Sequence, residues 1–369
     1  MLALVFCLPA EAKAGPELGA SIVADTLANV SGGILSGAET LWRADATATF
    51  DAPFGIEGAT AFVDIMHSRG KDFSGKRVGD AQVVSNVQGD GKLRPFEAWI
   101  EVPLAGSGLA FKAGLVDLNT EFDVQPVGAF FLNSSHGIGP EFSQSGDAGP
   151  SIFPVTSSAL ILRWGDECKS LRLGAFNAVA GDPDSPANFR VRLPGNDGLL
   201  MVGEGDVTLR GVTVQLGAWA YTSWGQRLGR PEGVTARQGQ GIYGQVHGRI
   251  AGRRNERTLD GWIRAGRAGG ATNRIGTYVG GGFTYGNDDE KVGLAIASAR
   301  QTSGAARIFA PMEGRQARAE TIVELSYARQ VTESITFQPD LQYVRRPSWS
   351  KEIRDALVVG VRLSLVVGG

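Results

Sequence analysis

Polar side chains that could bind a small solute are concentrated in one long segment, residues 114–157. The segment lacks helical or strand periodicity and holds too many large apolar residues for a disordered loop. We therefore expect residues 118–155 to fold into the interior of the protein as a loop that narrows it. Its carboxylates would accept hydrogen bonds, and its neutral polar groups would donate and accept them. The candidate solute contacts in this loop are Asn119, Glu121, Asp123, Asn133, Ser134 and His136.

Hydrolysis is the catalytic chemistry that these residues would allow, with Ser134 or Ser135 as nucleophile and His136 as base. Folding brings a nucleophile and its base together, so adjacency in a loop carries no weight, and the chain has no G-x-S-x-G motif. The three histidines, His67, His136 and His247, show no metal-ligand spacing. We therefore expect no enzyme and no metal site, and keep a hydrolase only as an alternative.

The elements that must position these residues are short β-strands. Between Ile335 and Tyr343 apolar residues alternate with polar ones, so that one face is apolar and the other hydrophilic. The same alternation, with boundaries good to about two to four residues, predicts sixteen strands. They are expected at 20–34, 39–51, 57–68, 93–103, 108–117, 156–164, 169–179, 198–206, 211–223, 239–250, 258–268, 276–286, 291–301, 319–330, 335–343 and 357–367.

The connections between these strands differ in length at the two ends. Counted from the first strand, even-to-odd connections are short, such as 104–107 and 287–290, whereas odd-to-even connections include 69–92 and 118–155. Long loops at one end only, and an even number of strands, are typical of outer-membrane barrels. We predict an all-β fold: a closed antiparallel 16-stranded transmembrane β-barrel formed by a single domain, residues 15–369.

The alternation also assigns side chains to the inner face of the barrel. This face carries charges of both signs, which would cost little only if water or a partner reached them. We therefore expect a water-filled channel and regard most of these charges as solvated or salt-bridged wall residues. The predicted inner face comprises Glu97, Trp99, Glu101, Lys112, Arg163, Arg172, Gln215, Trp219, Tyr221, Trp262, Arg264, Glu320, Glu324, Gln338, Asp340, Gln342 and Arg362.

Composition and the N-terminal residues narrow the class of protein further. Lysine plus arginine number 36 against 38 aspartates and glutamates, which argues against a basic surface for nucleic acid. Residues 1–14 hold the apolar run LALVFCL and then Ala-Lys-Ala, the small-x-small form of a signal-peptidase site, so we predict a signal peptide. No later stretch of 18 apolar residues predicts a membrane-spanning helix.

Four motifs resemble those of the OprB-type carbohydrate-selective porins of Gram-negative bacteria. They are DLNTEFD at 117–123, FLNSSHG at 131–137, GPSIFP at 149–154 and FQPDLQY at 337–343. The resemblance implies a passive, cofactor-free channel in the outer membrane, through which sugars such as glucose, or oligosaccharides, diffuse into the periplasm. It also implies contact with the lipid bilayer, lipopolysaccharide and the outer-membrane assembly machinery, and a monomer or homotrimer.

A channel that selects sugars needs aromatic faces for the apolar side of the ring and hydrogen-bonding groups for its hydroxyls. On the barrel wall, the candidates for these roles are Trp219, Trp262, Arg163, Arg172, Arg264, Asp340 and Arg362. The four arginines leave an alternative open, because inward cations would also favour anions. That alternative is a general or anion-preferring diffusion porin.

Overall fold

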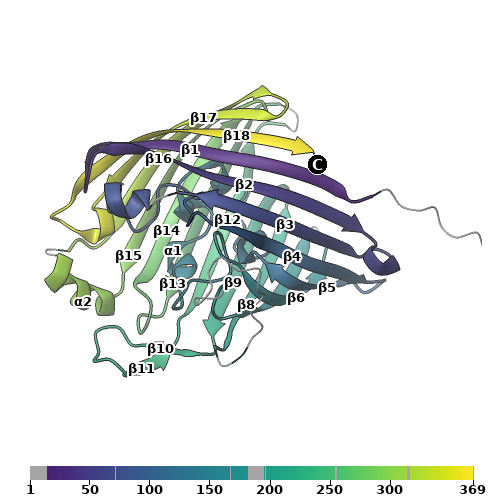
Figure 1. Ribbon diagram of the computed structural model, residues 1–369, viewed down its shortest axis with the longest axis horizontal. Helices are drawn as coiled ribbons and strands as arrows, with labels where there is room; N and C mark the ends of the chain where they lie inside the picture. The colour runs from purple at the N-terminus through teal and green to yellow at the C-terminus, as the bar shows by residue number, and fades with distance from the viewer. Residues whose placement is uncertain are drawn as a thin grey trace, which may run out of the picture.

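The structure is a computed structural model that describes residues 15–70, 72–166, 168–181, 195, 197–253, 256–313 and 316–368. The predicted signal peptide, residues 1–14, lies outside the described residues. Sixteen strands pair antiparallel with their neighbours, and the sheet closes because the last strand pairs with the first (Figure 1). The predicted fold, a closed 16-stranded antiparallel barrel, is confirmed.

The ends of the barrel strands differ from the predicted ends by three residues at most. The strands are β1 (Glu17–Gly33), β2 (Gly37–Asp51), β3 (Thr60–Arg69), β4 (Leu93–Leu104), β5 (Leu109–Val116), β6 (Ser157–Gly165), β7 (Lys169–Asn177), β8 (Leu199–Leu209), β9 (Val212–Tyr221), β12 (Gln240–Ala251), β13 (Thr258–Ala268), β14 (Ile275–Gly286), β15 (Glu290–Gln301), β16 (Glu320–Thr332), β17 (Ile335–Arg345) and β18 (Arg354–Gly368).

Shorter elements occupy the connections. Two of them were predicted only as loop: the hairpin of β10 (Trp224–Gln226) and β11 (Thr235–Arg237), and the helix α2 (Ser303–Glu313). A three-residue strand is too short to show a period of two, so the alternation could not reveal the hairpin. The remaining short elements are η1 (Pro53–Gly55), η2 (Ser74–Val78), η3 (Leu118–Thr120), η4 (Gly128–Phe130), η5 (Ser134–His136), α1 (Pro140–Ser143) and η6 (Pro347–Trp349).

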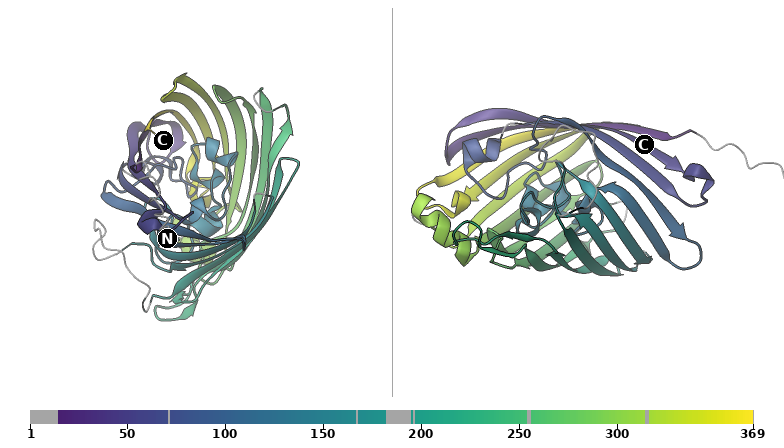
Figure 2. Two further views of the ribbon diagram at one scale, coloured as in Figure 1. Left: turned by 90° about the vertical axis from the view of Figure 1, so that its right-hand side faces the viewer. Right: turned by 60° about the horizontal axis from the view of Figure 1, so that its bottom comes forward.

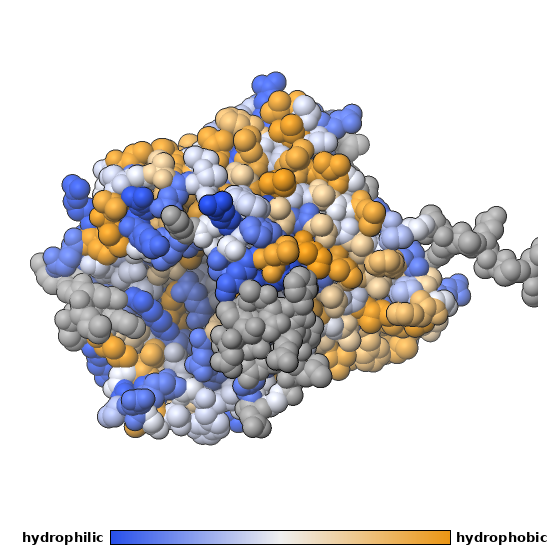
Figure 3. Space-filling model, in the orientation of Figure 1, coloured by the Kyte–Doolittle hydropathy of each residue, from blue (hydrophilic) through white to orange (hydrophobic). Residues whose placement is uncertain are grey.

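The outer surface of the barrel is apolar along the strands. In β15, Leu294 and Ile296 point outward and are exposed, whereas Ala295 and Ala297, which alternate with them, are buried inside. Figure 3 shows hydrophobic residues over the strands and hydrophilic residues gathered at the end that carries α2 and β10–β11.

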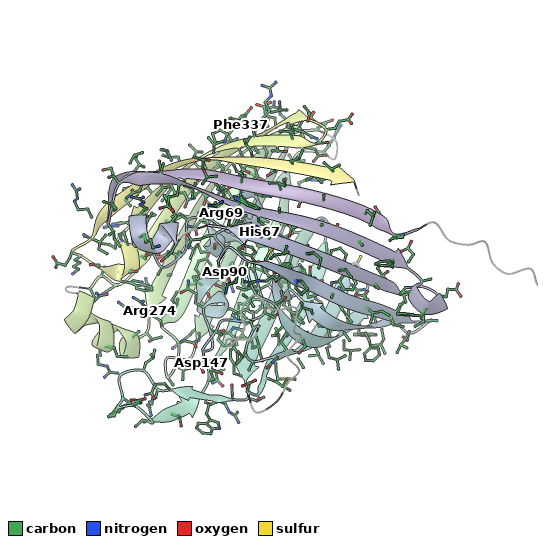
Figure 4. All side chains as sticks on the ribbon, in the orientation of Figure 1. His67, Arg69, Asp90, Asp147, Arg274 and Phe337 are labelled. Carbon is green, nitrogen blue, oxygen red and sulfur yellow. The ribbon has the colours of Figure 1, made fainter. Side chains whose placement is uncertain are left out.

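Phe337 lies at the outer edge of the barrel (Figure 4). It is one of several exposed aromatic residues near the end with the short turns, with Phe50, Trp164, Phe283 and Tyr285. Such a girdle is typical of a membrane interface.

The two ends of the barrel differ as the connection lengths predict. Short turns such as 105–108 and 210–211 join strands at one end, and long loops, including 117–156, join them at the other. In the described part of the chain, no helix has the length and apolar character needed to cross a membrane. Because of their length, the long loops are the connections that can reach into the barrel or cover its mouth.

Candidate functional site

Residues 117–156, here called the large loop, lie inside the barrel (Figure 2, left). The loop is bonded to strands far from its own ends. Gln125 donates to Gln245 of β12 at 2.6 Å, and Asn133 donates to Gln342 of β17 at 3.2 Å. Four of its large apolar side chains are fully buried, namely Phe122, Phe131, Leu132 and Phe142. The loop therefore divides the interior instead of lying over the mouth of the barrel.

Three buried glutamates of the barrel wall hold the backbone of the large loop. They accept N–H groups at three separate places: Glu97 from Asp117 (3.1 Å), Glu204 from Asp123 (2.7 Å), and Glu324 from Leu132 (2.5 Å) and Asn133 (3.0 Å). Such bonds are charge-assisted, and buried N–H groups would be costly without them. The alternation predicted two of these glutamates as inner wall residues but missed Glu204, although it lies on the same inward face of β8 as Val202 and Asp206.

Arg264 of β13 joins two parts of the large loop. Its guanidinium makes two bonds to the Asp123 carboxylate, at 2.8 and 2.6 Å, and one to Glu141 at 2.8 Å. All three side chains are fully buried. Two glycines make room for this cluster, because a Cβ on Gly139 would lie 1.9 Å from the Arg264 Nη1, and one on Gly266 would lie 1.8 Å from the Glu141 Oε1. The arrangement is a buried ion-pair triad in which one guanidinium contacts both carboxylates.

The two predicted aromatic contacts, Trp219 and Trp262, lie beneath the large loop. Phe142 of α1 stacks on Trp219 with ring centroids 4.9 Å apart and planes inclined by 6°. The ring of His136 lies 5.8 Å from that of Trp262. Because Trp219 is 2% and Trp262 6% exposed, a solute would reach these rings only if the loop moved.

A second segment, residues 72–92, also reaches the interior; we call it the small loop. Its Ala81 and Gln82 N–H groups donate to Glu320 of β16 at 2.9 and 3.0 Å. Its backbone meets the large loop where Ser134 N donates to Val83 O at 3.0 Å. From the sequence, this segment was predicted only as a long connection. Its apolar residues were the signal for a buried loop, because Phe73, Val78, Val84 and Val87 are all buried.

The small loop also covers an ion pair between the first and last strands. Arg362 of β18 donates to Asp25 of β1 at 2.6 and 2.7 Å, and its Nη2 reaches Asn86 of the small loop at 2.6 Å. Ser85 donates a further bond to Asp25 at 2.7 Å. Arg362, a predicted solute contact, therefore closes the seam of the barrel and holds the small loop.

Two adjoining cavities lie between the large loop and the end with the short turns; together we call them the vestibule. One has a volume of about 490 Å³ and the other about 530 Å³, and Pro126 and His247 line both. Arg163 and Arg172 line the smaller cavity. Of the predicted solute contacts, these two line the vestibule.

Arg163 and Arg172 are each paired with a carboxylate, whereas Arg249 and Lys291 line the larger cavity beside Asp260. Arg163 lies 2.6 Å from Glu101, and its side chain remains 47% exposed. Arg172 lies 2.8 Å from Glu204 and is also paired with Asp206. These two pairs therefore offer hydrogen-bonding groups with little unbalanced positive charge.

The other predicted solute contacts mainly fasten the large loop or the wall. Asn119 donates to the carbonyls of Phe122 and Asp123 at 3.2 and 3.1 Å. Ser134 is half-buried at the start of η5. Two predicted acids are bonded inside the barrel, Glu121 to Lys112 and Asp340 to Ser326.

His136 lies in a setting unsuited to general base catalysis. It is fully buried beside Phe131, with ring centroids 5.2 Å apart, and burial lowers its pKa to about 3. The Ser135 hydroxyl donates to Asn133 Oδ1 at 2.7 Å, and within the described residues no serine hydroxyl is hydrogen-bonded to His136. The hydrolase alternative therefore finds no nucleophile and base in contact here.

Comparison with known proteins agrees with this architecture. Residues 39–366 match the family model described as carbohydrate-selective porin, OprB family. No curated protein matches the chain. OprB of Pseudomonas putida in its high-pH structure has a TM-score of 0.84 and 19% identity, covering 96% of this chain and 94% of that one. Its low-pH structure has a TM-score of 0.59 and 17% identity, covering 96% and 93%. The outer membrane channel DcaP of Acinetobacter baumannii has a TM-score of 0.57 and 10% identity, covering 96% and 99%. These three likenesses concern the fold.

Replacing Arg264 should destabilise the protein far more than replacing Arg163. Arg264→Met leaves two buried carboxylates unpaired, so we expect a loss of about 3–5 kcal/mol in the free energy of unfolding. Arg163→Met removes an exposed pair and should cost about 1 kcal/mol or less. Urea unfolding of both variants in lipid vesicles measures the difference. Equal losses would contradict the role of the Arg264 triad.

Asp117, in the large loop, should make stability depend on pH. Burial raises the pKa of this carboxyl to about 7, so the folded protein holds its proton more tightly than the unfolded chain and loses stability as the pH rises from about 4 to 7. Asp117→Asn keeps the acceptor that bonds to Asn119 N at 2.8 Å but cannot ionise. We expect the variant to gain on the order of 1 kcal/mol relative to the native protein at pH 8, and little at pH 4. An equal change at both pH values in urea unfolding would refute this assignment.

Proposed function

Because this chain belongs to the OprB family of carbohydrate-selective porins, we propose that sugars cross its barrel beside the large loop and leave through the vestibule. The protein is a passive carbohydrate channel of the Gram-negative outer membrane. The sugar needs no cofactor on this route, and we propose that it meets no catalytic group. We further propose that residues 1–14 direct export, that the outer-membrane assembly machinery inserts the barrel, and that it works as a monomer or homotrimer.

The observation that supports passage of a neutral solute is the pairing of the four inward arginines that were predicted as solute contacts. The four arginines that kept the anion alternative open all contact carboxylates: Arg163 contacts Glu101, Arg172 contacts Glu204, Arg264 contacts Asp123, and Arg362 contacts Asp25. A guanidinium that is paired with a carboxylate attracts an anion only weakly. The guanidinium still offers donors, and the carboxylate still offers acceptors, to the hydroxyl groups of a solute. Such a wall favours a hydroxylated, uncharged solute over an anion.

Among the predicted contacts, we propose that Arg163 and Arg172 meet the sugar in the vestibule. Both line the smaller cavity, and their partner carboxylates lie beside them. Gln215 and Thr213 line the same cavity and add neutral donors and acceptors. The half-buried Ser134 and Asn119 remain candidates beside the large loop. For the fully buried Asp123 and Arg264, we propose an anchoring role.

Sugar block of conductance tests the proposed selectivity. In a planar bilayer, single-channel conductance of the refolded protein should fall with added glucose and saturate, because a bound sugar excludes ions from the path. Phosphate added at the same concentrations should have little effect, because these four arginines are already paired. Block by phosphate without block by glucose would favour the anion-preferring alternative.

Removing the partner carboxylates should make the channel more permeable to anions. In the double variant Glu101→Gln/Asp206→Asn, Arg163 and Arg172 lose a partner each, and we expect the permeability of chloride relative to potassium to rise roughly threefold or more. The reversal potential in a KCl gradient gives this ratio. Asp288→Asn, at the exposed turn beyond β14, is the control for a lost charge outside the cavities. An unchanged ratio in the double variant would mean that ions do not pass these arginines.

A further inference from the structure

Two arginines stand side by side on the lipid-facing surface at the end with the long loops. In the strand register, Arg267 of β13 and Arg300 of β15 are both paired with Thr277 of β14, so they flank it on the outer face. Both are exposed, and among the described residues neither has an ion-pair partner. Two strand spacings put their Cα atoms about 10 Å apart.

These arginines lie where the apolar outer surface of the barrel ends. Two residues farther from the long loops, Val279 of β14 is 47% exposed. Two residues beyond it, Ile263 and Ile296, which are both paired with Gly281, also face outward. We expect a guanidinium at the edge of this apolar band to lie at the level of the lipid head groups. The pair therefore faces the outer leaflet of the membrane.

A groove of about 440 Å³ runs beside Arg267. Its outward-facing walls are Ala220, Gln240 and Ile242, and its upper end is formed by Gly269 and Gly270. Ile242 is paired with Arg267 in the register, so an apolar and a cationic group stand next to each other on the outer face. The absence of side chains at the two glycines leaves the groove open towards the loops. Its shape and polarity suit an amphiphilic molecule.

A second cavity, of about 380 Å³, adjoins the groove, because Gly270 lines both. It lies between the loop after β10, the loop after β13 and the start of α2. Arg227, Arg230 and Arg307 line it, and none of the described residues around it is acidic. The N-terminal end of an eleven-residue helix adds to the positive potential there. The neighbouring Arg274, labelled near α2 in Figure 4, lies over the Trp349 ring at 5.2 Å and is not counted in this site.

We propose that the groove and this cavity bind a phosphorylated lipid of the outer leaflet, that is, lipopolysaccharide. Arginine binds phosphate through charge-assisted, often bidentate hydrogen bonds, which accounts for the cations. The apolar wall at Ile242 would contact an acyl chain of the same molecule, which a free phosphate could not use. The site is separate from the sugar path, so it does not depend on the proposed function.

Binding of diphosphoryl lipid A to the refolded protein in detergent, counted by native mass spectrometry, tests this proposal. The double variant Arg267→Gln/Arg300→Gln should bind about thirtyfold more weakly than the native protein. Monophosphoryl lipid A should bind the native protein less tightly than the diphosphoryl form. Inorganic phosphate at millimolar concentration should not displace the lipid. Block of conductance by glucose should be unchanged in the double variant.

Matched controls make the result specific to this site. Arg329 is exposed on the outer face of β16 near the end with the short turns, so Arg329→Gln removes a similar charge far from the groove. Equal weakening by Arg300→Gln and Arg329→Gln would overturn the location of the site. Undiminished binding by the double variant would overturn the site itself, and displacement by inorganic phosphate would assign it to free anions. If the double variant does not fold, as judged from its mobility on unheated gels, equal binding of the two forms of lipid A to the native protein would overturn the proposal.

Discussion

The interior of this barrel depends on hydrogen bonds from loop N–H groups to buried wall carboxylates. The strands pair their own backbone groups around the closed wall, so a loop that enters the lumen must find side-chain partners. Glu320 shows the arrangement most fully, because it accepts N–H groups from the small loop at 2.9 and 3.0 Å and from Ser348 at 2.6 Å. Without the loops these carboxylates would lack their donors, and without the carboxylates the loops would carry unpaired N–H groups. Wall and loops therefore stabilise each other.

The same requirement shapes what the interior offers to a solute. A charge placed away from bulk water must be paired, and the inward arginines have carboxylate partners at contact distance. The pairs that anchor the loops are fully buried, whereas those in the vestibule keep part of their surface open. The buried ion pairs thus stabilise the loops, and the more exposed ion pairs are the ones that a solute can contact.

Strands were predictable from sequence because a wall with lipid on one side and polar groups on the other imposes a period of two, as in Leu294 to Ala297. The path of the loops was not, because it is fixed by single contacts between distant residues, such as Gln125 with Gln245. Residue type alone likewise could not separate Arg264, which is buried in a triad, from Arg163, which lines a cavity. Trp219 looked available to a solute for the same reason, since Phe142 covers it only in the folded protein.

The seam between β1 and β18 bears on how the barrel forms. Asp25 and Arg362, which are 337 residues apart in the chain, meet across it. Contacts of such separation form late, and until then both strands present unpaired edges. A shift of the pairing by one residue would turn one side chain of this pair from the lumen to lipid, where a lone charge is costly. The ion pair therefore favours the native strand register over a shifted one when the barrel closes.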